Sequence, residues 1–231
     1  MNEAARIGIL GGTLDPVHLG HLEAALAARE ALRLDRVVLI PAHVPPHRSR
    51  PTSSPFHRFA MASLAVNGLD GLSASDMELL SPGPSYTADT LDHFQEALGI
   101  RASQIFFITG ADAFAEIETW HRYPEVLDLG NFIVVSRPGM TLPQLRQQLP
   151  GLKARMRLPV GDVRSAPGTS IFLVDAPTPD VSSTDVRRRI AEGEPICGLV
   201  PLTVEYHIRQ HELYTGPSTI TSTADHLHGQ N

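Results

Sequence analysis

The sequence predicts an α/β fold in which helices cover both faces of a doubly wound parallel β-sheet, in a single domain. The first observation is that short runs rich in β-branched and aromatic residues alternate with helical patterns along the 231 residues. Such alternation is typical of βαβ units, whose strands are parallel and whose right-handed crossovers place helices on both faces. The second observation is the length, which suits one α/β domain better than two small ones.

Each predicted strand is a short, mostly apolar run, and the strands in order are residues 6–10, 36–40, 105–109, 132–136 and 171–174. The predicted helices show apolar residues at helical spacing and are residues 20–33, 55–67, 87–98, 112–116, 123–128, 142–149, 183–192 and 201–211. Between them, residues 41–55 predict a long loop and residues 150–170 a second, mobile one, because both are rich in loop-forming residues. We expect residues 1–215 to form the domain and residues 216–231, with few large apolar groups, to be a disordered tail. In such a Rossmann-like arrangement, ligands bind at the carboxyl ends of the strands.

The composition excludes some classes of function. The net charge of −6 argues against a general nucleic-acid surface, and no apolar run is long enough to span a bilayer, so neither nucleic acid nor a membrane is expected as a partner. The single cysteine, Cys197, forms no internal disulfide, and the first ten residues lack the pattern of a secretory signal. We therefore expect a cytoplasmic protein.

The most informative segment is residues 11–21, which read GGTLDPVHLGH between the first strand and the first helix. A helix start offers unpaired N–H groups and the positive end of the helix dipole, which suits an anion. Two histidines there, His18 and His21, therefore predict a bound phosphate group. The loop lacks the G-x-G-x-x-G fingerprint of dinucleotide-dependent oxidoreductases and the Gly-Lys-Ser/Thr of a Walker A loop. Two histidines are also half a metal site, but no further ligands follow at suitable spacing, so no metal ligand is predicted.

A second helix start is predicted at residues 181–187, which read VSSTDVR. Ser182 or Ser183 can cap this helix, and Arg187 can add a charged fork for phosphate oxygens. An ordinary cap has the same pattern, and taken alone the segment is better explained as such a cap. Other arginines are expected in a structural salt bridge (Arg58) or in solvent (Arg188 and Arg189).

Two more segments carry candidate binding residues. Residues 85–91 read SYTADTL and predict a helix start whose first N–H groups suit a carboxylate, although a simple N-cap is an equal alternative. Asp112 follows the predicted strand 105–109 within the sequence Gly-Ala-Asp, and Trp120 comes eight residues later. A tryptophan taken alone is more often a packing residue than a ligand contact.

The opening loop resembles the (H/T)xGH loop of the nucleotidyltransferase superfamily and, more narrowly, that of the bacterial nicotinate-mononucleotide adenylyltransferases, which usually have Phe where this chain has Leu14. Residues 181–187 (VSSTDVR) resemble the ISSTxIR motif of that family, and residues 85–91 (SYTADTL) match its SYTxDTL segment. The Gly-Ala-Asp segment at residues 110–112, followed by Trp120, also resembles a segment of that family. Pro45-Pro46-His47-Arg48 resembles the family's PPHK, with a planar arginine fork in place of a lysine ammonium. The resemblance covers about residues 6–215.

The resemblance implies a nucleotidyltransferase domain that converts ATP and nicotinate mononucleotide to nicotinate adenine dinucleotide and pyrophosphate in NAD biosynthesis, with Mg²⁺ bound mainly through the phosphates of ATP. Catalytic roles are implied for His18, His21 and Arg187. These three and six further residues would bind ATP: Gly11, Gly12, Thr13, Ser182, Ser183 and Thr184. The implied substrate-binding residues are Asp15, His47, Arg48, Tyr86, Thr87, Asp112, Trp120 and Arg137. A homo-oligomer is left open.

Two alternatives remain open at this point. Another adenylyltransferase of the superfamily would act on nicotinamide mononucleotide or on phosphopantetheine. A non-catalytic nucleotide-binding regulator would keep the pocket without the reaction, although the intact His18, His21, Ser183 and Arg187 argue against lost activity. Pyrophosphate release with each acceptor in turn separates these alternatives.

Overall fold

The computed structural model of the protein describes residues 5–45, 51–80, 83–159 and 168–215. Within these residues, seven strands form one sheet in the order β3-β2-β1-β4-β5-β7-β6, and every paired strand is parallel to its neighbour. The strands are β1 (Ile7–Gly12), β2 (Arg36–Pro41), β3 (Leu72–Ala74), β4 (Ile105–Gly110), β5 (Asn131–Val135), β6 (Met156–Arg157) and β7 (Ile171–Val174). The predicted α/β fold with a parallel sheet is confirmed.

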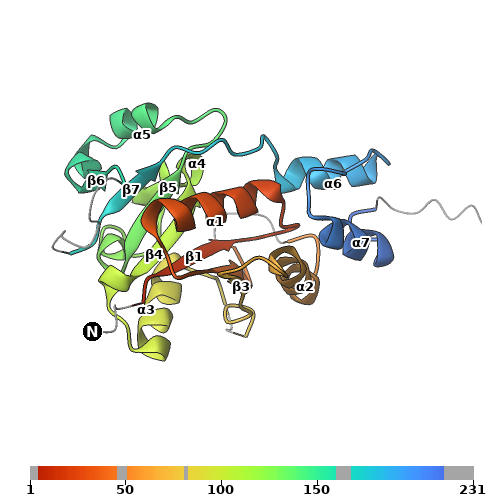
Figure 1. Ribbon diagram of the computed structural model, residues 1–231, viewed down its shortest axis with the longest axis horizontal. Helices are drawn as coiled ribbons and strands as arrows, with labels where there is room; N and C mark the ends of the chain where they lie inside the picture. Colours follow the sequence, from red (N-terminus) through yellow and green to blue (C-terminus); the bar gives the residue numbers. More distant parts are fainter. Residues whose placement is uncertain (1–4, 46–50, 81–82, 160–167, 216–231) are drawn as a thin grey trace, which may run out of the picture.

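The helices are α1 (Leu19–Leu32), α2 (Pro55–Val66), α3 (Thr87–Leu98), α4 (Ala111–Phe114), α5 (Leu142–Gln148), α6 (Ser183–Ala191) and α7 (Leu202–Gln210). Short 3₁₀ turns are η1 (Ala102–Gln104), η2 (Ile117–Thr119), η3 (Glu125–Asp128) and η4 (Pro150–Arg155). Figure 1 shows α1 lying against the strands, with α6 and α7 together at one end of the molecule.

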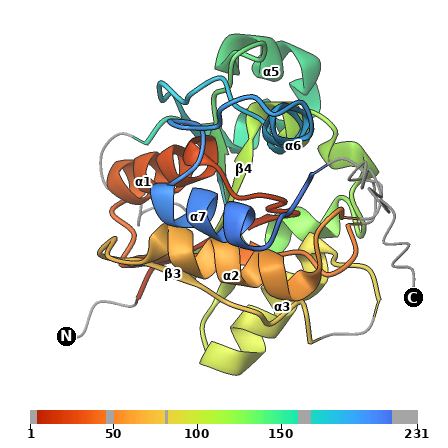
Figure 2. The ribbon, with the colours of Figure 1, turned by 90° about the vertical axis from the view of Figure 1, so that its right-hand side faces the viewer.

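Two apolar cores lie on opposite faces of the sheet, because successive strand side chains point to opposite faces. In β1, for example, Ile9 packs into one core and Leu10 into the other. Helices α1, α2, α6 and α7 close the core that contains Leu10, and α3, α4 and α5 close the core that contains Ile9. Figure 2 shows α7 beside α2, with which it is in contact. Helices therefore cover both faces, as a doubly wound sheet requires.

The structure corrects the predicted elements in a few places. Strands β3 and β6 were not predicted, because runs of three and two residues carry no measurable periodicity. The mobile loop predicted at residues 150–170 was wrong in its first part, where η4 and β6 lie; residues 160–167 are outside the described ranges. The predicted helix 112–116 is the single turn of α4, and the predicted helix 123–128 is the 3₁₀ turn η3. The predicted tail, residues 216–231, also lies outside the described residues.

The order of the strands in the sheet predicts where the binding crevice lies. From β1 the chain proceeds outward to β2 and β3, and then returns to the other side of β1 to form β4, β5 and β7. This reversal between β1 and β4 is a topological switch point, where doubly wound sheets bind ligands at the carboxyl ends of their strands. No helix in the described ranges combines the length and the apolar character needed to cross a membrane.

Candidate active site

A cavity of about 560 Å³ opens at the carboxyl ends of β1 and β4. This volume is in the range of small-molecule sites. Every predicted site residue that the structure describes lines it: Gly11, Gly12, Thr13, Asp15, His18, His21, Tyr86, Thr87, Asp112, Trp120, Arg137, Ser182, Ser183, Thr184 and Arg187. The other two, His47 and Arg48, lie outside the described residues.

The two histidines of the opening loop stand at the start of α1. His18 is the N-cap residue, and its backbone N–H donates to Nδ1 of His21 at 3.2 Å. Because that nitrogen accepts a hydrogen bond, the proton of a neutral His21 lies on Nε2. The two rings stack, with 3.7 Å between centroids and 28° between planes. The pair therefore forms a compact donor surface at a helix N-terminus.

His18 is held as a neutral ring. It is 2% exposed, and its Nδ1 is buried without a hydrogen-bond partner among the described residues. Burial, followed by the positive charge of Arg137, lowers the pKa of His18 to about 3. Near neutral pH this residue is a hydrogen-bonding group without charge, and an anion in the cavity would favour its protonation.

The glycine between the two histidines is required by the position of the first ring. A Cβ atom on Gly20 would lie 3.1 Å from Nδ1 of His18 and 3.3 Å from Cγ1 of Val181. Both distances are tighter than ordinary van der Waals contact, so a side chain here would displace the ring or the segment that precedes α6.

The second predicted helix start is hydrogen-bonded to the first loop. The hydroxyl of Ser183 donates to the carbonyl oxygen of Pro16 at 2.8 Å, and Nη1 of Arg187 donates to the carbonyl oxygen of Asp15 at 2.6 Å. Ser182 is the capping residue, since its hydroxyl accepts from the N–H of Asp185. Two motifs that are far apart in the sequence therefore form one continuous wall of the cavity.

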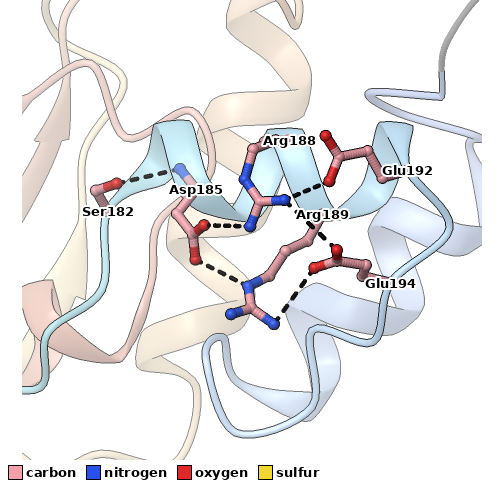
Figure 3. Close-up of polar contacts among 6 residues, drawn as sticks. All are labelled: Ser182, Asp185, Arg188, Arg189, Glu192 and Glu194. Atoms are coloured by element: carbon pink, nitrogen blue, oxygen red, sulfur yellow. Dashed lines mark hydrogen bonds and ion pairs between the residues drawn. The ribbon is translucent and has the colours of Figure 1, made fainter.

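The two arginines that follow Arg187 belong to an ion-pair network on the outer side of α6 (Figure 3). Arg188 contacts Asp185 at 2.8 Å and Glu194 at 3.5 Å and also pairs with Glu192, while Arg189 contacts Asp185 at 2.9 Å. Their side chains are 45% and 35% exposed, so they lie in contact with solvent as expected, but they are paired. Of the three consecutive arginines, Arg187 lines the described cavity, and Arg188 and Arg189 do not.

Asp15 was predicted to bind substrate, but its carboxylate is occupied by protein donors. The side chain is 2% exposed and accepts from the N–H of Thr52 at 2.6 Å, from the hydroxyl of Tyr214 at 2.6 Å, and from the N–H and hydroxyl of Ser53. It thereby joins the phosphate loop to the start of α2 and to the chain after α7. A direct contact between Asp15 and substrate stays a prediction.

Arg58 of α2 supports the same loop through carbonyl groups, and among the residues that the structure describes it does not form the predicted salt bridge. Its side chain is fully buried and donates to the carbonyl oxygens of Thr13 at 3.0 Å, His43 at 3.3 Å, and Ala42. Burial lowers the pKa of this guanidinium, while nearby Asp15, Tyr214 and Glu78 oppose the shift. A sequence signal did exist, because Arg58 occupies the apolar face of α2 with Met61, Ala62 and Ala65.

The opposite side of the cavity is aromatic. Tyr86 is the N-cap residue of α3 and stacks on His121, with 4.2 Å between ring centroids. Trp120 is half-buried and meets Phe107 and Phe132 in edge-type contacts at 6.1 and 6.2 Å. The tryptophan is thus both a packing residue and part of the cavity wall.

Asp112 and Arg137 converge over the end of β4. A Cβ atom on Gly110 would lie 2.5 Å from Oδ1 of Asp112 and 3.1 Å from Cδ of Arg137. A glycine at this point therefore allows an acidic and a basic side chain to lie close together at the edge of the cavity. Sequence reasoning did not single out Thr109, Glu116 or Thr178, which also line it.

Comparison with known proteins agrees with this geometry. Residues 9–189 match the family model described as cytidylyltransferase-like. A relative from Thermoanaerobacter sp. (strain X514), named "Probable nicotinate-nucleotide adenylyltransferase", is 38% identical, and the match covers 93% of this chain and 96% of the relative. A relative of the same name from Roseiflexus sp. (strain RS-1) is 41% identical, with 91% and 98% covered.

A solved structure shares the fold. It is that of the Plasmodium falciparum nicotinic acid mononucleotide adenylyltransferase complexed with NaAD, with a TM-score of 0.69 and 17% sequence identity. The match covers 91% of this chain and 98% of that chain. The chain therefore belongs to the cytidylyltransferase-like family, among the nicotinate-nucleotide adenylyltransferases.

Proposed function

We propose that this protein transfers the adenylyl group of ATP to nicotinate mononucleotide, giving nicotinate adenine dinucleotide and pyrophosphate in NAD biosynthesis. The observation that carries the proposal is the hydrogen-bonded wall formed by the loop of His18 and the start of α6 with Ser183 and Arg187. It faces a cavity whose other side holds Trp120. The relatives bear the name of this activity.

The reaction needs positioning and charge stabilisation more than proton transfer. The attacking group is a phosphate monoester whose second pKa is about 6, so it is mostly ionised near neutral pH. The barrier comes from the approach of two anions and from the charge that grows on pyrophosphate. Donors fixed in place before the reaction lower such a barrier.

The residues of the wall can act on the triphosphate in distinct ways. His21 offers its Nε2–H, because its Nδ1 accepts from the backbone. His18 offers a neutral ring that gains a proton more readily beside an anion, so its positive charge would develop when the triphosphate is present. Arg187 adds a planar charged fork in the first turns of α6, and the first two residues of that helix, Ser183 and Thr184, also line the cavity.

The acceptor side suits a pyridine carboxylic acid. Thr87, the first residue of α3, lines the cavity, and the first N–H groups of a helix are donors without a partner inside the helix. A nicotinate carboxylate accepts from such donors, whereas the NH₂ of an amide would oppose them. Trp120 provides a ring for stacking against the pyridine, and Asp112 provides an acceptor for a ribose hydroxyl.

Mg²⁺ fits this site as part of the ATP complex, where it neutralises phosphate charge. The carboxylate of Asp15 is already occupied by protein donors and that of Glu78 accepts from Thr90, so the exposed Asp112 and Glu116 are the acidic groups of the described lining that can contact its hydration shell. A cytoplasmic location is the matching expectation, because the single cysteine forms no internal disulfide.

A pyrophosphate-release assay tests the proposal. The protein is incubated with Mg-ATP and, in turn, with nicotinate mononucleotide, nicotinamide mononucleotide and phosphopantetheine. We expect release with the nicotinate compound and much slower release with the other two. Release with none would favour a nucleotide-binding regulator, and preference for phosphopantetheine would favour another branch of the superfamily.

A variant links this activity to the described wall. We expect His18→Ala to reduce kcat by orders of magnitude while its circular dichroism spectrum stays that of the parent. Turnover close to that of the parent would contradict the role given to this residue.

A further inference from the structure

Three histidines gather on the side of the molecule where α2 meets α7. His57 lies in the first turn of α2, His207 lies in α7, and His211 directly follows the end of α7. The ring nitrogens that they offer all lie within 4.8 Å of one another. None of the three is among the residues that line the described cavity. We call them the three-histidine cluster.

The spacing of these ring nitrogens is compatible with a shared metal ion. Nδ1 of His57 and Nε2 of His207 are 3.1 Å apart. Two imidazole nitrogens bound to one tetrahedral zinc ion, with bonds of about 2.05 Å, lie roughly 3.3 Å apart. His207 and the C-cap residue His211 are four positions apart, a spacing that places them on the same side at the end of α7, and His211 is exposed.

The donor set selects the kind of ion. Three imidazoles favour Zn²⁺, Cu²⁺, Ni²⁺ or Co²⁺, whereas Mg²⁺ and Ca²⁺ prefer oxygen ligands. Imidazole binds a metal in its neutral form.

We propose that the three-histidine cluster binds one divalent transition-metal ion, with Zn²⁺ the best fit, and that the ion clamps α7 to α2. Three protein ligands leave a fourth position for water, as in open zinc sites. This ion is separate from the Mg²⁺ that accompanies ATP, both in its ligands and in its place on the protein.

The three-histidine cluster is connected to the phosphate loop through residues that lie close to it in the sequence. His57 is followed by Arg58, whose guanidinium holds the carbonyl of Thr13. The chain after α7 leads from His211 to Tyr214, whose hydroxyl holds the carboxylate of Asp15. An ion that fixes α7 against α2 would therefore steady two of the supports of the loop.

Metal binding is tested on the full chain without nucleotide. Competition of Zn²⁺ with a chromophoric chelator measures affinity and stoichiometry, and Co²⁺ reports the ligand geometry through its visible absorption. The parent for this test carries His226→Ala and His228→Ala, since these two histidines near the end of the sequence could bind zinc by themselves. We expect one tight site per chain and the intense visible bands of tetrahedral Co²⁺.

Single substitutions assign the site to the cluster. His57→Ala and His211→Ala should each weaken zinc binding at least tenfold and abolish the Co²⁺ bands. His93→Ala, which removes an exposed histidine of α3, is the matched control and should change neither. His21→Ala should also keep the tight site, which separates the cluster from the histidine pair of the cavity. Unchanged affinity in His57→Ala or in His211→Ala would overturn the proposal, leaving an imidazole–imidazole hydrogen bond without a metal.

The proposed clamping of α7 to α2 is tested separately, by thermal stability and amide hydrogen exchange. Zinc at about a hundred times its Kd should raise the Tm of the parent by roughly 5–10 °C and slow amide exchange in α7. Neither effect should occur in His211→Ala, whose exposed side chain can be removed without disturbing the fold. Equal effects of zinc in the parent and in His211→Ala would also refute the proposal.

Discussion

The neutral state of His18 has a consequence for stability that can be measured. Burial lowers its pKa from the ordinary value of 6.5 to about 3. In the unfolded chain the same imidazole titrates near 6.5, so below that pH the unfolded chain binds a proton that the folded protein does not. The free energy of unfolding therefore falls as the pH drops through 6.5 toward 3, and this contribution is fully present above 6.5.

The size of the effect follows from the two pKa values. One pKa unit corresponds to about 1.4 kcal/mol, so the loss between about pH 7.5 and about pH 5 amounts to roughly 2 kcal/mol. His18→Gln keeps a polar side chain but cannot titrate. We expect the free energy of unfolding of the parent to fall over this interval by about 2 kcal/mol more than that of the variant.

Urea unfolding without nucleotide, at about pH 7.5 and about pH 5, measures both values. The Cε1–H resonance of His18 in an NMR titration provides an independent check, since it should stay at its neutral position down to about pH 5. An equal pH dependence in parent and variant, together with a resonance that titrates near 6.5, would refute the reasoning. The assigned role of this histidine as an uncharged hydrogen-bonding group in the absence of nucleotide would then be wrong.

Three further predictions concern residues around the cavity. Arg187→Ala should reduce kcat by about 10²- to 10³-fold, because a preorganised charged donor is lost. Arg188→Ala is its matched control and should leave kcat nearly unchanged, because its ion pairs are on the exposed side of α6; equal losses would contradict the assignment. Arg58→Met should lower the free energy of unfolding by about 3 kcal/mol in urea titrations, because buried carbonyl groups lose their charged donor; a change below about 0.5 kcal/mol would speak against its supporting role. Trp120→Ala should raise KM for nicotinate mononucleotide about tenfold or more and that for ATP much less; equal increases in steady-state assays would argue against stacking.

Local patterns were sufficient for most of the architecture. Strands of four to six residues and helices of nine or more are visible in the sequence because their apolar periodicity extends over several residues. Strands β3 and β6 could not be predicted in this way, since their two or three residues are held by pairing with β2 and β7. Such pairing is decided by tertiary structure and leaves little trace in local composition.

The candidate site was predictable where it depends on helix starts. Residues 11–21 and 181–187 each combine small or capping residues with groups that suit phosphate, and the structure places both at the cavity. The role of Arg58 was not predicted, because its partners are backbone carbonyls of segments that come together only in the folded protein. The protein donors around Asp15 were missed for the same reason, since Tyr214 lies almost at the other end of the described chain.

The sequence by itself determined the α/β class, the family and the two motifs that line the cavity at the starts of α1 and α6, because these depend on strand–loop–helix order and on short motifs. Only the tertiary structure decided the charge of His18, the separation of Arg187 from its two ion-paired neighbours, and the meeting of His57 with His207 and His211. The physical reason is that burial and contacts between distant segments set these properties. Neither quantity exists until the chain has folded.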